Sequence, residues 1–430
     1  MPVVLTAIVI VFIVAWFVCF ACQSGVTASN AKLKLFVTEK RVYQGEGVNR
    51  KDIIYIFVIA LIFRIAVYIA SVVYLYIFSE ETTFGFADFL SAWNRWDAPH
   101  YIDIASKGYA GCIQDGEHLF LVFFPLYPWL LRIVHVVINN WEAACLVLSC
   151  LAYAAGSCFF YALISEEYGK RIAWKSLVLL SVYPFSFFFG AMMTESLFLC
   201  TMMAGFYFVK KHNWLAVGLT GIFCSLCRVQ GILLFGVAGV EFFVYYKPFE
   251  MFKQHKGKEF IKLLFTKGIF LFLIPVGNFI YFYINYKVEG NPFQFSIYQK
   301  EHWYHSTTYF TNALKEIWGQ AFGGNTQNTM IASVWLPELV IFAVTIILLF
   351  YGLRRHPLKY TAFLFVYTII NYSVTFLISG GRYMSCAFPL FIILGEILDR
   401  HPKFYNMVVA VSSVFFAIYM AGYLSWKQIM

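Results

Sequence analysis

Long apolar stretches alternate with short polar loops along almost the whole chain. Most of these stretches run for about 17 to 25 residues with almost no charge, which is enough for a helix to cross a hydrocarbon core of about 30 Å. The pattern predicts an all-α polytopic membrane protein with about twelve transmembrane helices. The predicted spans are residues 3–22, 53–78, 143–164, 174–190, 194–209, 214–231, 232–246, 268–286, 331–352, 360–379, 383–398 and 405–424.

Two longer polar stretches, residues 79–142 and 287–330, interrupt this alternation. In the first stretch, apolar residues recur at helical spacing from Trp93 to Ala105, which predicts an amphipathic helix lying at the membrane interface. The run from Leu119 to Ile138 contains two prolines and predicts a second interfacial or re-entrant piece. We therefore expect interfacial helices within the first of the two loops.

The chain divides into a short N-terminal part, residues 1–52, and one membrane domain, residues 53–430. The N-terminal part consists of an extra apolar helix and a basic linker. No basic segment precedes the apolar run from Val3 to Cys22, so we interpret it as a retained helix with its N-terminus outside; a signal peptide is the alternative.

Composition agrees with a membrane protein. Hydrophobic residues make up 61% of the 430 residues and charged residues only 13%, whereas soluble domains carry about 25% charged residues. All but one of the ten cysteines lie within apolar segments, Cys112 being the exception, so the pattern shows no disulfide framework. These values exclude an ordinary soluble protein.

The basic residues predict the orientation of the chain. Its net charge is +9, but most of the 32 Lys and Arg residues fall in alternate loops, as the positive-inside rule requires of cytoplasmic loops. This explains the charge without a nucleic-acid partner. The predicted inside loops are residues 23–52, 165–175, 210–213, 247–267, 353–359 and 399–404.

Four arginines do not follow this rule. Arg95, Arg132, Arg228 and Arg382 are predicted outside, beside apolar segments rather than in long solvated loops. The outer side has few basic residues. A cation at the membrane boundary on that side is costly and invites a functional explanation. The fork of arginine binds phosphate well, although snorkelling to lipid headgroups is the alternative. Arg64, inside a predicted span, needs a carboxylate or backbone carbonyls as partners.

Four sequence blocks occur in an order that resembles a known family. They are RWDAPHYIDIASKGY followed by FFPLYP, YPFSFFFGAMMTESLF, CRVQG and GRYMSCAFPLF. Together they resemble the PIG-V family, the second mannosyltransferase of GPI-anchor assembly, with its bacterial relatives. The resemblance covers roughly residues 88–395 and is densest up to residue 231. Gln230 departs from the Asn that eukaryotic members tend to have, and the loop 110–120 is longer than usual.

The resemblance implies a GT-C fold and an inverting transfer of mannose from a polyprenyl- or dolichyl-phosphate donor. The acceptor would be a glycolipid or glycan outside the cytoplasm. The family places the catalytic base in the first external loop, which matches Asp97 here. Partners would then be membrane lipids, the donor and the acceptor. The site would face outward from a bacterial cell membrane, or the lumen of the endoplasmic reticulum in a eukaryote; a chain rich in Phe, Ile and Lys favours a bacterium.

Asp97 is also the leading candidate from the residues themselves. An inverting transfer needs one carboxylate to accept the proton of the attacking hydroxyl, although an ion pair with Arg95 or a helix-end charge would explain Asp97 too. Asp103 ranks second because it lies six residues later, on another helix face. His100 is three residues after Asp97 and could orient it, or it could simply be packed.

Several other residues are candidates for substrate binding. Glu195 lies at a break between two apolar runs, where it could bind sugar hydroxyls or hold an arginine. Gln294 and Trp303 belong to a stretch that mixes amides and aromatic rings, as carbohydrate sites do, although interfacial anchoring explains the rings equally well. The full set of candidates is Arg95, Trp96, His100, Asp103, Glu195, Arg228, Gln230, Gln294, Trp303 and Arg382.

We expect no metal and no other cofactor, because the histidine pair His302 and His305 lacks a third ligand at a convincing spacing. Two alternatives to the mannosyltransferase remain open. A transferase of the same fold could use another lipid-phosphate sugar or a protein acceptor. A lipid or polysaccharide transporter should instead show charges across the midplane and broken helices in paired halves. A monomer is compatible with the sequence, which does not determine the oligomeric state.

Overall fold

A computed structural model describes residues 2–26, 44–78, 85–324 and 326–429. These residues form helices joined by loops, and their β-structure is limited to two isolated bridges. The all-α fold class is therefore confirmed. Part of the predicted basic linker, residues 27–43, and the beginning of the first predicted loop, residues 79–84, lie outside the described residues.

The first half of the chain contributes helices α1 to α9 and three 3₁₀ turns. Their bounds are α1 Pro2–Gln23, α2 Arg50–Phe78, α3 Phe86–Trp93, α4 Ala98–Lys107, η2 Tyr109–Gly111, η3 Leu119–Val122, α5 Leu126–Ile138, α6 Trp141–Tyr168, α7 Lys170–Ser181, η4 Ser186–Gly190, α8 Glu195–Lys210 and α9 Trp214–Cys227.

The second half contributes helices α10 to α21, the 3₁₀ turns η5 and η6, and one π-helical turn, η7. Their bounds are η5 Val229–Ile232, α10 Leu233–Tyr246, α11 Pro248–Lys253, α12 Gly257–Thr266, η6 Gly268–Leu273, α13 Val276–Glu289, α14 Gln294–His302, α15 Phe310–Phe322, α16 Asn328–Met330, η7 Ile331–Trp335, α17 Leu336–Arg355, α18 Leu358–Asn371, α19 Gly380–Met384, α20 Pro389–Asp399 and α21 Pro402–Leu424.

The chain is a multi-pass membrane protein, but twelve full spans are not confirmed. Among the described residues, 6 helices are long and apolar enough to cross a membrane, or 7 if the bent pair Gly257–Leu273 and Val276–Glu289 forms one span. The other predicted spans are shorter apolar helices or broken ones. The single span predicted over residues 174–190 is wrong, since α7 ends at Ser181 before Pro184, which cannot continue a helix.

The single amphipathic helix predicted from Trp93 to Ala105 is also wrong, because two helices replace it. Residues 94–97 separate α3 from α4, and Trp96 lies in the left-handed region at φ 56°. A proline in the first turn of α4 favours a new helix start at this point. The break places Asp97 at the N-cap of α4 instead of on a helix face.

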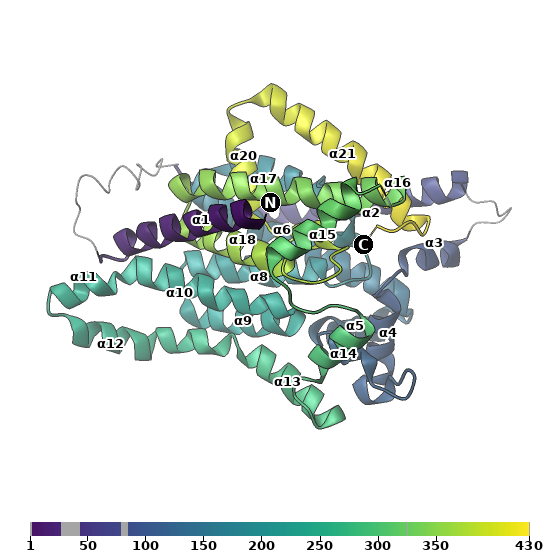
Figure 1. The fold of residues 1–430 in the computed structure, drawn as a ribbon, viewed down its shortest axis with the longest axis horizontal. Helices are drawn as coiled ribbons and strands as arrows, with labels where there is room; N and C mark the ends of the chain where they lie inside the picture. The colour runs from purple at the N-terminus through teal and green to yellow at the C-terminus, as the bar shows by residue number, and fades with distance from the viewer. Residues whose placement is uncertain (1, 27–43, 79–84, 325, 430) are drawn as a thin grey trace.

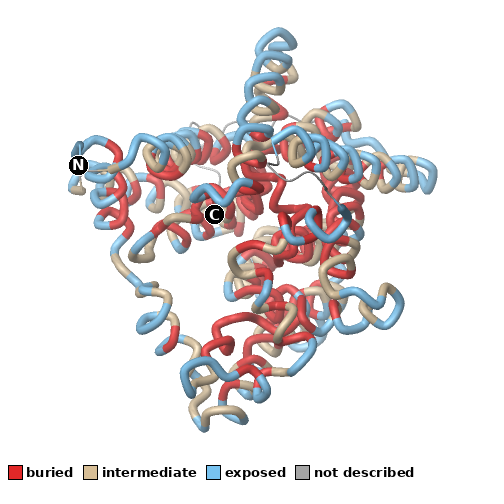
Figure 2. The backbone as a smooth tube through the Cα atoms, turned by 90° about the vertical axis from the view of Figure 1, so that its right-hand side faces the viewer, coloured by how far each residue is buried: buried red, intermediate tan, exposed pale blue. Residues whose placement is uncertain are grey.

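Helices of the interior pack closely, and the outer helices expose apolar side chains. At Gly156 of α6, a Cβ would lie 3.1 Å from the Cα of Cys200 of α8, a close approach of the kind that small residues allow between membrane helices. On α2, Ile62 and Ile69 are 57% and 60% exposed. Figure 2 shows buried residues gathered inside and exposed ones along the outer helices. Exposed isoleucines of this kind suit contact with lipid.

The irregular segment between α7 and α8 is held by α2. Arg64 donates to the carbonyl of Ser186 at 2.9 Å and lies 3.9 Å from the ring centre of Tyr153, while Tyr68 donates to the carbonyl of Gly190 at 2.6 Å. Arg64 thus has a backbone carbonyl as a partner, one of the two predicted possibilities. Non-helical backbone at membrane depth is tolerated when protein buries it in this way. The segment ends where Glu195 begins α8.

The broken elements gather toward one end of the bundle. Figure 1 shows α3, α4, α5 and α14 at its right-hand end and α11 and α12 at its left-hand end, with α1, α8, α10 and α18 running between. The two ends therefore differ in kind: irregular, polar turns lie at the first, and basic loops join helices at the second.

Candidate active site

Four charged residues from distant parts of the chain meet at the end that carries α4. Arg382 donates from an Nη to Oδ2 of Asp97 at 3.1 Å, and its Nε contacts Oε1 of Glu195. Arg228 contacts the same oxygen of Glu195 through an Nη. We call Asp97, Glu195, Arg228 and Arg382 the ionic cluster. Its formal charges cancel, so it forms a neutral network with two cations and two anions.

Breaks in helices position every member of the ionic cluster. Asp97 precedes α4 and Glu195 begins α8, so both acids lie at helix N-termini, where the helix dipole favours negative charge. Arg228 lies between α9 and η5, and Arg382 lies in the short helix α19. Each side chain therefore projects from a helix end toward one point.

Burial makes the network depend on its pairing. Glu195 is fully buried, Arg382 and Arg228 are nearly so, and only the Asp97 side chain is substantially exposed, at 31%. Removing one partner from a buried ion pair leaves a charge without compensation, which costs about 3–5 kcal/mol. Thr194 adds a further contact, since its hydroxyl accepts from Nε of Arg228 at 2.7 Å. Asp97 is thus the member that solvent or a substrate can reach.

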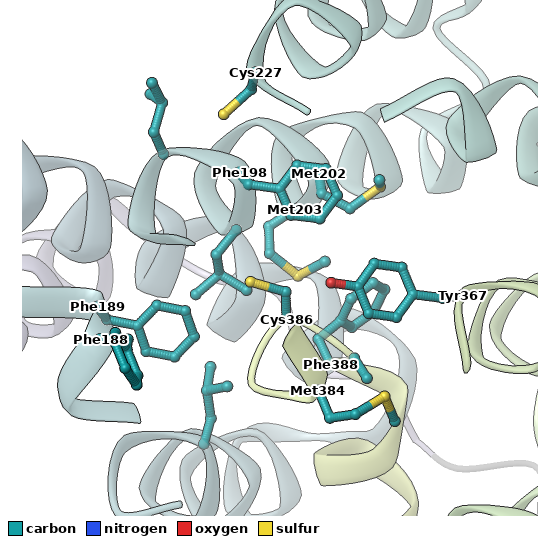
Figure 3. Packing of buried hydrophobic residues seen from close by; sticks show 14 of the residues in the cluster. Phe188, Phe189, Phe198, Met202, Met203, Cys227, Tyr367, Met384, Cys386 and Phe388 are labelled. Carbon is teal, nitrogen blue, oxygen red and sulfur yellow. The ribbon is translucent and has the colours of Figure 1, made fainter. Parts of the chain in front are cut away.

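Aromatic and sulfur-containing side chains surround the buried part of the cluster. The guanidinium carbon of Arg382 lies 5.2 Å from the ring centre of Phe188, and that of Arg228 lies 5.8 Å from the ring centre of Phe198. Figure 3 shows Phe198 close to Met203 and Cys386 in the same apolar core. Such surroundings exclude water and strengthen the ion pairs.

A buried acid that the sequence analysis missed holds the backbone next to Arg382. Glu338 of α17 accepts from the backbone N–H of Gly381 at 2.9 Å and from the hydroxyl of Tyr372 at 2.8 Å. It is 2% exposed. A lone acid within a predicted apolar span is itself a signal of function, because a charge there is costly. Glu338 therefore fixes the backbone of the turn that presents Arg382.

The turn that carries Arg228 depends on Gly231. A Cβ at Gly231 would lie 2.1 Å from the carbonyl oxygen of Cys224, which the backbone can avoid only by shifting. We expect Gly231→Ala to destabilise the protein by about 1–3 kcal/mol, as overpacking does, and to lower its melting temperature. A Cβ at Gly239 would meet nothing within 4 Å, so Gly239→Ala is the control. Equal melting temperatures for the two variants would contradict this role.

Two imidazoles lie near the Asp97 carboxylate. Burial lowers the pKa of His100, against the opposing effect of Asp97 and Asp103, and the ring stacks on Phe123 and meets Phe120 at a tilt of 49°. Burial also lowers the pKa of His305, again opposed by Asp97. Both rings therefore favour the neutral form near neutral pH. His305 was considered only as a metal ligand from the sequence, and the structure places it instead within the electrostatic reach of Asp97.

Comparison with known proteins bears on this site. A family model described as dolichyl-phosphate-mannose-protein mannosyltransferase matches residues 124–277, less than half of the chain. The matched region contains Glu195 and Arg228 of the ionic cluster. The match supports a GT-C glycosyltransferase. With the all-α membrane fold, the predicted GT-C fold class is confirmed. No curated protein matches the chain in a direct comparison.

Other candidates from the first loop lie outside the ionic cluster. Asp103 pairs with Lys107 at 2.7 Å on the side of α4 where both are partly exposed. Arg95 donates to the carbonyl of Leu424 at 3.0 Å and lies 3.9 Å from the ring centre of Trp426. Arg95 therefore ties the first loop to the residues that follow α21. Trp96 packs against the same Trp426, with ring centres 5.8 Å apart.

The remaining candidates lie around the cluster without joining it. Gln230, two residues after Arg228, donates to the side chain of Asn371 at 3.1 Å. Gln294 accepts from Asn291 at 3.2 Å at the beginning of α14. Trp303 meets Phe123 edge to face at 5.9 Å, which brings the second predicted loop over the first. Their roles in binding substrate stay predictions.

Metal independence is testable. Among the described residues, no group of three or more His, Cys, Asp or Glu side chains is arranged to hold a metal ion, and His302 pairs with Glu117 at 3.0 Å. We expect sugar transfer by the purified protein to continue undiminished in excess chelator, because the ionic cluster supplies cations for a phosphate. Loss of activity that a divalent cation restores would contradict this expectation.

Proposed function

We propose that this protein is an inverting mannosyltransferase that moves mannose from a polyprenyl-phosphate donor to a glycolipid or glycan acceptor. The observation that carries the proposal is the ionic cluster, in which a reachable carboxylate, Asp97, lies beside two arginines. The family match supports the donor class, because that family is described as dolichyl-phosphate-mannose-protein mannosyltransferase. A carboxylate and a phosphate-binding fork are the parts that such a transfer needs.

The reaction would use Asp97 as the base. Its carboxylate accepts the proton of the acceptor hydroxyl while that oxygen forms a bond to the anomeric carbon of the sugar. The bond from the anomeric carbon to the phosphate oxygen breaks, and the polyprenyl phosphate leaves with the electron pair. Arg382 and Arg228 would hold that phosphate through charge-assisted hydrogen bonds.

The pairing of Arg382 with Asp97 suggests how donor binding prepares the base. In the structure Arg382 holds the Asp97 carboxylate at 3.1 Å. A phosphate that enters the cluster brings negative charge and competes for the same guanidinium. Asp97 would then be released toward the acceptor only after the donor is bound. The base would therefore be free to accept a proton only when both substrates are in place.

We place the site on the extracytoplasmic side. The basic residues concentrate in loops at the opposite end of the bundle, which the positive-inside rule assigns to the cytoplasm. A bacterial cell membrane with the site outside is our first choice, and the endoplasmic reticulum with a luminal site is the eukaryotic equivalent. A cysteine introduced beside Asp97 should react with an impermeant thiol reagent added from outside intact cells; protection there would contradict this orientation.

A protein acceptor is the second candidate, since the matching family is described as acting on proteins. The deciding experiment presents purified protein with labelled polyprenyl-phosphate mannose and a membrane extract containing both lipids and proteins. Label in the lipid fraction supports the first proposal, and label in the protein fraction supports the second. If no label moves from the mannose donor, but the protein transfers label from a glucose or arabinose donor, the sugar assignment is overturned.

A further inference from the structure

An apolar groove opens between α1, α10 and α18 and extends along α10 from Ile232, four residues after Arg228, to Val240. It has a volume of about 410 Å³ and a lining that is almost entirely apolar. Trp16 of α1, Gly236 and Val240 of α10, and Phe365 of α18 contribute to that lining. The three helices run side by side in Figure 1. A groove of this composition suits a hydrocarbon chain.

A charged pocket of about 300 Å³ follows the groove along the same three helices. Val240 lines the groove, and the next residue, Glu241, lines the pocket. Gln23 contributes from the end of α1, and Lys359 from the beginning of α18, less than one turn from the groove residue Ala362. An apolar groove thus leads directly into a polar chamber.

The charged pocket lies at the opposite end of the bundle from Asp97. At one end of α6, Glu142 accepts from Asn94, three residues before Asp97, at 2.8 Å. At the other end of α6, Glu167 lines the pocket. These acids are 25 positions apart in the sequence, which corresponds to about 37 Å along the helix axis. That length is close to the thickness of a bilayer. The pocket therefore belongs to the other leaflet, which the basic loops predict to be cytoplasmic.

The charges of the pocket are arranged for a ligand with two opposite charges. Lys359 is 2% exposed and pairs with Glu167 at 3.0 Å and Glu241 at 3.7 Å, so it fixes the pocket wall. Arg355 is exposed at the rim, and no carboxylate of the described residues forms an ion pair with it. Glu166 also lines the pocket; it pairs with Lys211 at 2.7 Å and is 17% exposed. The rim cation Arg355 and the partly exposed carboxylate of Glu166 offer partners for a phosphate and an ammonium group.

We propose that the groove and the charged pocket bind one phospholipid of the phosphatidylethanolamine class from the leaflet opposite the ionic cluster. Arg355, with Lys210, binds its phosphate. Glu166 accepts from its primary ammonium beside Lys211, and one acyl chain fills the groove beside Trp16. The lipid completes the packing of α1 against α10 and α18. Trp16 of α1 already donates from its indole N–H to the hydroxyl of Thr361 in α18, at 3.2 Å.

The test of the groove uses two glycines of α10. A Cβ at Gly236 or at Gly239 would meet nothing within 4 Å, but Gly236 lines this groove whereas Gly239 lines a separate apolar pocket. Leucine is a better helix former than glycine, so both variants should fold. Purified full-length protein is incubated with phosphatidylethanolamine, and retained lipid is counted by native mass spectrometry. We expect Gly236→Leu to lower retention about tenfold and Gly239→Leu to leave it unchanged.

The test of the headgroup compares three lipids and two arginines. Phosphatidylglycerol lacks the ammonium and phosphatidylcholine cannot donate from its quaternary nitrogen, so both should be retained about tenfold less than phosphatidylethanolamine. Arg355→Gln should lower retention of all three lipids, because each carries the phosphate, while its neighbour Arg354, which does not line the pocket, serves as the control in Arg354→Gln.

Equal retention of the three lipids, or unchanged retention in both Gly236→Leu and Arg355→Gln, would overturn the proposal. If Gly236→Leu instead blocks binding of polyprenyl phosphate alone, the groove belongs to the donor chain and the phospholipid proposal is wrong. The readout is lipid retention, so neither outcome depends on whether the protein transfers mannose.

Discussion

Sugar transfer should fall by about 10²- to 10⁴-fold when Asp97 is replaced by Asn, the range that a general base contributes. The amide has the shape of the carboxylate but cannot accept the proton of the attacking hydroxyl. Asp97 is the most exposed member of the ionic cluster, and among the described residues it forms an ion pair with Arg382 alone, at 3.1 Å. The variant should therefore fold and retain donor lipid. The measurement is labelled mannose transferred per minute from a synthetic polyprenyl-phosphate donor.

Two further variants make this result specific to Asp97. Asp115 lies exposed in a loop at φ 54°, a conformation that Asn tolerates well, so Asp115→Asn should leave transfer unchanged. Asp103→Asn tests the second-ranked acid, which the structure pairs with Lys107. A greater loss in Asp103→Asn than in Asp97→Asn would move the base to Asp103, and full activity in Asp97→Asn would remove the role from Asp97.

The membrane class was predictable because it depends on composition and on the length of apolar runs, which are local properties. The helix ends were harder. The run over residues 174–190 is apolar throughout, but Pro184 and the partners that Arg64 and Tyr68 offer to free carbonyls allow the chain to leave the helix there. Such a break depends on contacts with α2, more than a hundred residues earlier in the chain, which periodicity does not reveal.

The candidate site was predictable as a set of residues but not as a network. Arg228, Arg382 and Glu195 each attracted notice as charges beside apolar runs. That both arginines contact a single oxygen of Glu195 follows only from the packing of α8, α9 and α19. Glu338 could have been found by the same rule, since it is an isolated acid within a predicted span.

The neutrality of the ionic cluster has a consequence for binding. With two arginines against Asp97 and Glu195, the cluster carries no net charge to attract a phosphate from a distance. On the proposed function, we expect affinity to come from replacement of the Arg382–Asp97 contact by contacts to the phosphate. Glu195 is fully buried and contacts both arginines. We therefore expect Arg382 to exchange Asp97 for the phosphate, and Arg228 to keep its pair with Glu195 while it contacts the phosphate.

Donor binding should weaken by about 10- to 100-fold when Arg382 is replaced by Lys, because one or two charge-assisted hydrogen bonds are lost. Lysine keeps the positive charge but not the planar fork that contacts Asp97 and Glu195 together. The measurement is the dissociation constant for polyprenyl phosphate, by titration in detergent. Lys287→Arg, a change at an exposed position on α13, is the matched control for conservative exchange of a cation and should bind donor as the wild type does.

A double variant separates the role in phosphate binding from the role in folding. Arg382→Gln alone leaves the buried Glu195 with one arginine and could unfold the protein, since an uncompensated buried charge costs about 3–5 kcal/mol. Arg382→Gln with Asp97→Asn removes one charge of each sign and leaves the buried pair of Glu195 and Arg228 intact. We expect the double variant to melt near the wild-type temperature and yet to bind donor weakly. Wild-type donor affinity in a folded double variant would show that Arg382 only balances the acids of the ionic cluster and does not hold the phosphate.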